Sequence, residues 1–208
     1  MKTRTFVVLV IVLWGCFCSH SIAQTRKPVA RKTVSRKAKP EPKKEDPKVI
    51  FDMKLQGDGT FFIDSINNYY VANFTGKTAH QLYSDVLARL STIYTYPDKV
   101  TNKVEDRSII INAIVTKIDQ NEMMSVKHEF NLAYRVELQF KDGKIRLNVP
   151  TLTRAWEYAP YIERRTECNL STLSVKAMFY PRLKENANAY FNNLYTSLVY
   201  GTPQDEDW

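Results

Sequence analysis

The chain has 208 residues, a formal net charge of +8 and three cysteines. This length is enough for one domain with its own hydrophobic core, so stability does not require disulfide staples. Only Cys168 lies beyond the first 23 residues, which excludes an intrachain disulfide and a cysteine-based zinc site from the rest of the chain. We expect Cys168 to be a small, partly buried hydrophobe. An intermolecular disulfide is the alternative in an oxidising compartment.

Residues 1–23 have the pattern of a secretory signal peptide. Lys2 and Arg4 give a positive start, residues 6–17 form a short apolar run, and Ser21-Ile22-Ala23 resembles a cleavage site. The apolar run is too short to span a membrane. We therefore expect cleavage after Ala23 and export to the periplasm or the extracellular space. Association of the exported chain with the outer membrane is a further option.

A second interpretation of the same segment concerns Cys16. Leu13-Trp14-Gly15-Cys16 resembles a bacterial lipobox, in which the cysteine becomes a lipidated first residue. Trp14 is bulky where such boxes carry a small residue, so we prefer cleavage after Ala23. An outer-membrane lipoprotein lipidated at Cys16 remains the alternative.

Residues 24–48 form a basic, proline-containing linker. They hold ten lysines and arginines against three acidic residues and contribute +7 to the net charge, while residues 1–23 contribute +2. Residues 49–208 therefore carry a net charge of −1. The linker has four prolines, no aromatics and few large apolar side chains, so it cannot offset the entropy lost on ordering. We predict a disordered linker at 24–48 and a single domain at 49–208.

The first half of the domain contains strand-like segments and one helix. Residues 49–56 fit a short edge strand, and the aromatic-rich run 61–74 is interrupted near Asn67-Asn68. Apolar residues between 79 and 94 recur at three- and four-residue steps, with Thr78 and Gln81 placed for a capping box and Pro97 ending the helix. The isoleucine-rich run 108–118 indicates a central strand that is buried on both faces.

Residues 130–149 predict a β-hairpin. Apolar residues alternate with polar ones on both sides of Asp142-Gly143, a pair that suits a two-residue type I′ turn. This turn places Phe140 opposite Ile145 and Leu138 opposite Leu147, so the apolar side chains share one face.

The last segments are an alternating run and a helix. Residues 173–179 alternate and fit a strand before Pro181, and one apolar stripe runs from Leu183 to Leu198 with Gly201 after it. The order β-α-β-β-β-β-α predicts an α+β fold, with two helices packed on one face of an antiparallel sheet.

Three stretches carry a family resemblance: Thr75-Gly76-Lys77-Thr78 leading into Gln81-Leu82-Tyr83, residues 106–115, and residues 134–137 through 141–146. With this element order, the chain resembles a secreted bacterial family of unknown function that has a TATA-binding-protein-like (TBP-like) fold. The resemblance covers about residues 60 to 150. It implies that fold and a Gram-negative envelope setting, and it offers no catalytic residues to carry over. Fold alone does not imply DNA binding.

Two groups of residues are candidate interaction surfaces. The segment 154–165 combines aromatic side chains with arginines, the residue types that dominate interface hot spots; its candidates are Arg154, Trp156, Tyr158, Tyr161, Arg164 and Arg165. The alternative is a loop that packs its aromatics over the sheet edge. The polar face of the hairpin, with Arg135, Glu137, Gln139, Arg146 and Asn148, is either a solvated face or a ligand platform.

The sequence contains no recognised nucleophile, metal or phosphate-loop motif, and His80 and His128 have no second histidine at metal-ligand spacing. We therefore expect a non-enzymatic binding or assembly module without a cofactor. An envelope hydrolase or small-ligand enzyme with a site assembled from scattered residues is the alternative. The expected partner is an envelope component, namely an anionic lipid, lipopolysaccharide or a protein. We do not expect a nucleic-acid partner, because the chain is expected to be exported and the linker has no aromatic residues between its basic residues.

Overall fold

The structure is a computed structural model that describes residues 46–63 and 67–201. The predicted signal peptide, the alternative lipobox and all but the last three residues of the linker lie outside these residues. The strands are β1 (Lys54–Leu55), β2 (Phe61–Phe62), β3 (Tyr69–Asn73), β4 (Thr101–Val104), β5 (Ser108–Met123), β6 (Val126–Lys141), β7 (Lys144–Asn148), β8 (Thr151–Ala159) and β9 (Arg164–Cys168). The helices are α1 (Ala79–Ile93), α2 (Pro97–Val100), α3 (Leu173–Phe179) and α4 (Leu183–Tyr200), with 3-10 turns η1 (Pro160–Ile162) and η2 (Leu170–Thr172).

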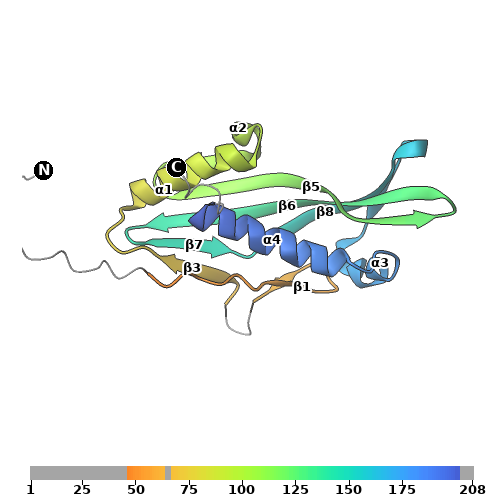
Figure 1. Cartoon of the computed structure of the whole chain (residues 1–208), viewed down its shortest axis with the longest axis horizontal. Coiled ribbons are helices and arrows are strands. Elements are labelled where there is room, and N and C mark those ends of the chain that lie inside the picture. The colour runs from red at the N-terminus through yellow and green to blue at the C-terminus, as the bar shows by residue number, and fades with distance from the viewer. Residues whose placement is uncertain (1–45, 64–66, 202–208) are drawn as a thin grey trace, which may run out of the picture. The chain divides into compact units, whose positions relative to one another are not determined.

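Seven strands form one antiparallel sheet around the long strand β6. The order is β3-β7-β6-β5-β4, and β8 continues the sheet from the first half of β6, with β9 beyond it. The helices α1 and α4 pack on one face of this sheet, as Figure 1 shows, and their apolar stripes share one core with the inward-facing strand residues. The α+β class with helices on one face of an antiparallel sheet is confirmed. The short strands β1 and β2 pair only with each other.

The predicted hairpin is confirmed in its register. Phe140 pairs with Ile145 and Leu138 with Leu147, and all four side chains are buried. The predicted type I′ turn is wrong, because φ is positive at Gly143 (71°) and not at Asp142. The reason lies outside the hairpin: the carboxylate of Asp142 accepts a hydrogen bond from the backbone of α1, and the backbone of Gly143 bonds to the chain just before α1.

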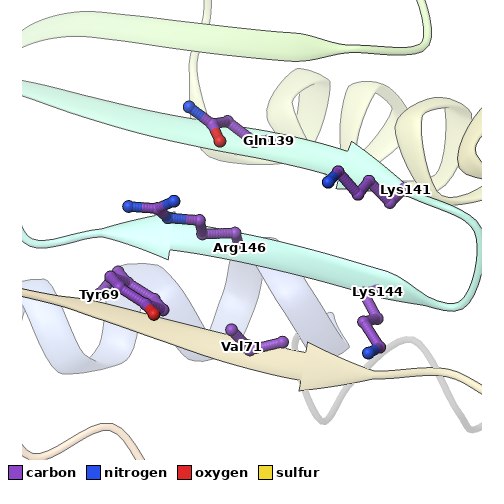
Figure 2. Close-up of a pocket in the computed structure, with 6 residues that line it drawn as sticks. All are labelled: Tyr69, Val71, Gln139, Lys141, Lys144 and Arg146. Atoms are coloured by element: carbon purple, nitrogen blue, oxygen red, sulfur yellow. The ribbon is translucent and has the colours of Figure 1, made fainter. Parts of the chain in front are cut away.

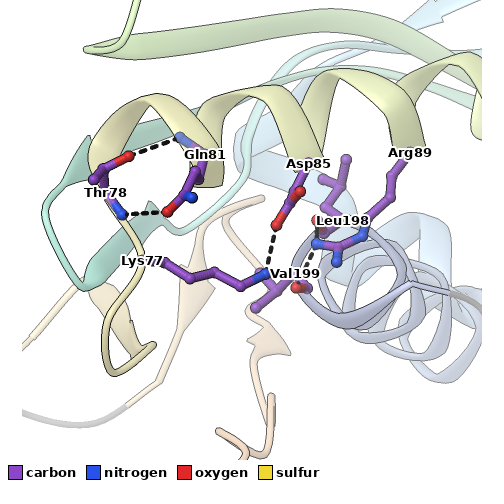
Figure 3. A network of polar contacts seen from close by, with 7 residues as sticks. All are labelled: Lys77, Thr78, Gln81, Asp85, Arg89, Leu198 and Val199. Atoms are coloured by element: carbon purple, nitrogen blue, oxygen red, sulfur yellow. Dashed lines mark hydrogen bonds and ion pairs between the residues drawn. The ribbon is translucent and has the colours of Figure 1, made fainter.

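Helix α1 begins where the capping box predicts. The Thr78 side chain accepts a hydrogen bond from the Gln81 N–H, and the Gln81 side chain accepts one from the Thr78 N–H (Figure 3). This reciprocal pair satisfies two backbone donors that the helix itself leaves free. The helix ends at Ile93, and Pro97 does not terminate it but starts the short helix α2.

Helix α4 forms as its stripe predicts, with Gly201 as its C-cap, and it is fixed at both ends. At its start, the buried Asp119 carboxylate accepts the Arg182 N–H at 3.0 Å. At its end, the Arg89 guanidinium donates to the carbonyls of Leu198 (3.2 Å) and Val199 (2.6 Å), as Figure 3 shows. A cation at the C-terminus of a helix satisfies free carbonyls and complements the helix dipole.

The strand predicted at residues 173–179 is wrong, because this segment is helix α3. Leu173 is buried, whereas Val175, Met178 and Phe179 are exposed. Seven residues fit both a two-residue and a helical period, so alternation alone cannot distinguish them. Its backbone bonds locally, as in the Tyr180 N–H bond to the Lys176 carbonyl. It meets the sheet through side chains: Lys176 contacts Glu157 of β8 at 2.8 Å, and the Asn121 amide of β5 donates to the Phe179 carbonyl at 2.7 Å.

Strand β5 is not buried on both faces as predicted. Ile109 and Ile111 are fully buried against the helices, while Ile114, on the other face, is 58% exposed. The pairing of β5 with β6 shifts between Val115 and Asp119. Within this bulge Lys117 has a positive φ of 57°, and its N–H donates to the buried Asn131 side chain at 2.9 Å. The helices therefore cover one face of the sheet and leave the other open.

A chain of three tyrosine hydroxyls crosses the core between the helices. The Tyr134 hydroxyl on β6 lies 2.9 Å from that of Tyr94, just after α1, and 2.8 Å from that of Tyr190 on α4. Tyr134 is 1% exposed. Burial is the main cause that raises the pKa of Tyr94 to about 12 and raises the pKa values of Tyr134 and Tyr190. The three hydroxyls therefore satisfy one another in the neutral form.

Candidate functional site

The two groups of candidate residues largely lie on the same face of the sheet, opposite the helices. Residues directly opposite on paired strands share a face, and side chains alternate along each strand. Gln139 is opposite both Ser108 and Arg146, while Arg154 is opposite Ala133. We call this surface the open face. It holds Arg135, Glu137, Gln139, Arg146 and Asn148 at one end, and Arg154, Trp156 and Tyr158 at the other.

A depression of about 240 Å³ lies on the hairpin end of the open face. It is lined by side chains from β3, β6 and β7, which Figure 2 shows on one side of the three strands. We call it the hairpin depression, and its lining residues are Tyr69, Val71, Gln139, Lys141, Lys144 and Arg146.

Cross-strand pairing sets the geometry of the hairpin depression. Lys141 is directly opposite Lys144 at the turn, and Arg146 is opposite both Val71 and Gln139. The Arg146 guanidinium carbon lies 4.0 Å from the centre of the Tyr69 ring, and its Nε donates to the Asn148 side chain at 3.2 Å. The Gln139 amide donates to Glu137 at 2.9 Å. An aromatic ring and a neighbouring amide thus position one arginine beside two lysines.

At the other end of the open face, the Trp156 side chain is buried under its neighbours and is not exposed for contact with a partner. It is 8% exposed, and the guanidinium carbons of Arg165 and Arg154 lie 4.3 and 5.9 Å from its ring centre. Both arginines pair with Glu167, at 2.8 and 2.6 Å. The hydrogen bond from Arg154, followed by the charges of both arginines, lowers the pKa of the Glu167 carboxyl. Trp156 is therefore held by its own neighbours.

The structure separates the remaining residues of the 154–165 segment. Tyr158 pairs with Arg165 on the open face, whereas Arg164 pairs with Ala159 and lies on the helix side of the sheet. There it lines a second depression of about 240 Å³ with His128, Glu157, Ala159, Ile162 and Thr166. Tyr161 lies in η1, beyond the end of β8, and is 74% exposed.

Several titratable groups outside the open face are engaged in pairs. His80 contacts Asp106 at 2.8 Å on the surface. Glu157 contacts the Lys176 ammonium at 2.8 Å, and this hydrogen bond is the main cause that raises the pKa of Lys176. Cys168 is half-buried beside the core, as predicted, and burial raises the pKa of its thiol. Within residues 46–63 and 67–201, no group of three or more His, Cys, Asp or Glu side chains is placed to hold a metal ion.

Sequence reasoning missed four residues of the hairpin depression: Tyr69, Val71, Lys141 and Lys144. The two lysines could have been found, because the hairpin register already places them opposite each other. The contribution of Tyr69 and Val71 depends on the pairing of β3 with β7, whose sequences lie about 75 residues apart and show no local sign of that pairing.

No family model and no curated protein matches the chain. Among solved structures, the chain is similar to a TBP-like protein from Parabacteroides distasonis, with a TM-score of 0.47 and 11% sequence identity. The match covers 62% of this chain and 87% of that chain. The similarity concerns fold only.

Proposed function

We propose that the chain is an exported, non-enzymatic protein of the cell envelope whose domain binds an envelope component through the open face of its sheet. The observation that carries the proposal is the open face itself. The helices and the core occupy the opposite side, and this side presents charged, amide and apolar groups over neighbouring strands. Export and the envelope setting rest on the signal-peptide pattern of residues 1–23.

The composition of the open face is more typical of a surface that binds a partner than of one that contacts only solvent. Ile114 is 58% exposed on it, in the position diagonal to the exposed Arg135. Val104, on β4 at the edge of the sheet, is 53% exposed on the same face. Exposed aliphatic side chains within a cationic surface can contact a partner that is itself part apolar and part anionic. The basic linker adds electrostatic attraction to anionic surfaces, which salt screens.

The lack of an enzymatic role is part of the same proposal. The acidic groups nearest to the two depressions are engaged: Glu157 with Lys176, and Glu137 with Gln139. Each of these two carboxylates is held by a neighbouring donor, which favours a structural role for it. In the part of the chain that the structure describes, no helix is long and apolar enough to cross a membrane.

The test is binding of the chain, purified as the cell exports it, to isolated envelope fractions at low and at moderate salt. The open-face variant carries Arg135→Ser and Ile114→Ser. The matched control removes one exposed cation and one exposed aliphatic residue on the helix side, with Lys184→Ser and Val175→Ser. We expect the parent and the control to bind at moderate salt and the open-face variant to lose binding.

Three results would contradict the proposal. Equal binding of all three proteins at moderate salt would show that the open face is not the recognition surface. Turnover of an envelope substrate by the parent chain, lost on a point substitution in either depression, would show an enzyme. If moderate salt abolishes binding of all three proteins, attachment belongs to the basic linker and the domain does not recognise the fraction.

A further inference from the structure

We propose that the hairpin depression binds a phosphate monoester group. The ligand class follows from the depression alone, whereas its source, an anionic head group of the envelope, rests on the proposed function. Three cationic side chains, Lys141, Lys144 and Arg146, line a cavity of about 240 Å³ together with an aromatic ring, an aliphatic side chain and an amide.

The first argument is that the pairing of Lys141 with Lys144 opposes folding of the hairpin. The two lysines are directly opposite across the turn, and like charges in that position destabilise a sheet. Arg146 adds a third positive charge two residues along the same strand. An anion bound between these side chains would convert the repulsion into attraction.

The second argument is that the three cations have no acidic partner. No ion pair joins Lys141, Lys144 or Arg146 to a carboxylate of the described residues, and Arg146 bonds only to the neutral Asn148 side chain. At the other end of the same face, by contrast, Glu167 already binds both Arg154 and Arg165. At the hairpin end, the Glu137 carboxylate accepts from the Gln139 amide at 2.9 Å and forms no ion pair with the three cations of the depression. The positive charge of Lys141, Lys144 and Arg146 therefore exceeds the negative charge at that end.

The third argument concerns ligand chemistry. A phosphate monoester carries nearly two negative charges near neutral pH and three acceptor oxygens, which matches three cationic donors. A carboxylate or a phosphodiester carries one charge and leaves more of the repulsion uncompensated. Stacking on Tyr69 fixes the orientation of the Arg146 guanidinium before the ligand arrives, which lowers the entropy lost on binding. Val71 supplies an apolar wall for the carbon atoms of the head group.

The experiment compares three proteins: the chain as exported, the site variant Lys141→Gln with Lys144→Gln, and the control Lys127→Gln with Lys184→Gln. The control removes the same charge from exposed lysines on β6 and α4 and leaves the basic linker intact. One arm titrates soluble glycerol 1-phosphate and follows the backbone amide signals of Lys144 and Arg146. The other arm measures binding to phosphatidylcholine vesicles that contain either phosphatidic acid, a monoester, or phosphatidylglycerol, a diester.

We expect the site variant to lose about tenfold or more in affinity for the monoester probes, while the control stays within about twofold of the parent. We also expect the site variant to unfold at the same temperature as the parent or higher, since a repulsive pair has been removed. Binding of the soluble probe would identify the phosphate group as sufficient. Binding restricted to phosphatidic-acid vesicles would identify a lipid head group as the source.

Equal losses in the site and control variants would overturn the proposal, because general charge would explain the binding. Equal affinity for both kinds of vesicle would also overturn it. If the parent binds envelope fractions but neither monoester probe, the phosphate site is wrong and the proposed function stands. A fourth outcome is that the site variant binds monoesters as tightly as the parent, while the Arg135→Ser, Ile114→Ser variant no longer binds the envelope fraction. In that case the ligand site lies elsewhere on the open face.

Discussion

The carboxylate of Asp142 accepts a hydrogen bond of 2.8 Å from the backbone N–H of Ala79, although the two residues are 63 positions apart. Ala79 is the first residue of α1, so its N–H has no acceptor within the helix. Two backbone bonds of 2.8 Å, from Phe74 to Gly143 and from Gly143 to Lys77, run beside it. The hairpin turn and the start of α1 therefore form one unit, next to the hairpin depression.

Replacing this carboxylate is predicted to destabilise the domain. Asp142→Ala removes both the acceptor for Ala79 and a negative charge at the N-terminus of α1, so we expect the free energy of unfolding to fall by about 1 kcal/mol. Urea unfolding measures this loss. Asp52→Ala is the control, because the Asp52 carboxylate makes an exposed contact of 3.4 Å with Lys54, and the backbone bond of this residue to Tyr70 is kept. This substitution should cost less than about 0.5 kcal/mol. Equal losses in the two variants would contradict the role of Asp142.

The tyrosine chain predicts a second stability effect. Tyr134→Phe removes the hydroxyl that joins Tyr94 to Tyr190, and we expect it to cost about 1–2 kcal/mol, because two partly buried hydroxyls lose their shared partner. Thermal or urea unfolding tests this. Tyr96→Phe removes a hydroxyl from a side chain that is 65% exposed, and it should leave stability unchanged. A cost no larger than that of the Tyr96 variant would show that the chain of hydroxyls contributes nothing.

The same residues predict loss of stability in alkaline solution. The pKa of Tyr94 is raised from 10.0 to about 12 in the folded chain, mainly by burial. Below about pH 10 both folded and unfolded chains keep the proton, and the contribution of Tyr94 to stability is complete. Between about pH 10 and 12 the unfolded chain releases it first, so stability falls by about 1.4 kcal/mol per pH unit for this group.

Urea unfolding between about pH 9 and 12 tests this pH dependence. Tyr94→Phe cannot ionise at this position, so its stability should fall less steeply above about pH 10 than that of the parent. An unchanged slope in the variant would contradict the assignment.

Trp156 provides a spectroscopic prediction. Arg165→Ala uncovers the indole that its guanidinium now approaches at 4.3 Å, so we expect tryptophan emission to shift to longer wavelength and quenching by iodide to increase. Arg154→Ala should have a smaller effect, since its guanidinium is 5.9 Å away. Arg164→Ala is the matched control, because Arg164 lies on the other side of the strand. An equal emission shift in the Arg164 and Arg165 variants would contradict the placement of Trp156.

Some of the fold could be read directly from the sequence because the signal is local. The register of the hairpin follows from alternation on both sides of Asp142-Gly143, and the start of α1 follows from Thr78 and Gln81. In each case the residues that determine the structure are close neighbours along the chain. Hydrophobic periodicity and helix capping are properties of a few consecutive residues, so both can be predicted without knowing the rest of the structure.

Other features depended on contacts between distant segments. The run 173–179 is a helix that contacts the sheet through Lys176 and Glu157. Trp156 is covered because β9 brings Arg165 and Glu167 to its ring. The hairpin depression needs β3 beside β7 to place Tyr69 next to Arg146.

The sequence by itself thus determined the hairpin at 130–149, the helices that begin at Ala79 and Leu183, and which side chains of these elements share a face. Only the tertiary structure decided which faces meet, which aromatic is covered and where unpaired positive charge collects. The physical reason is that local periodicity acts within one element, whereas burial and charge pairing depend on neighbours that folding brings together from distant parts of the chain.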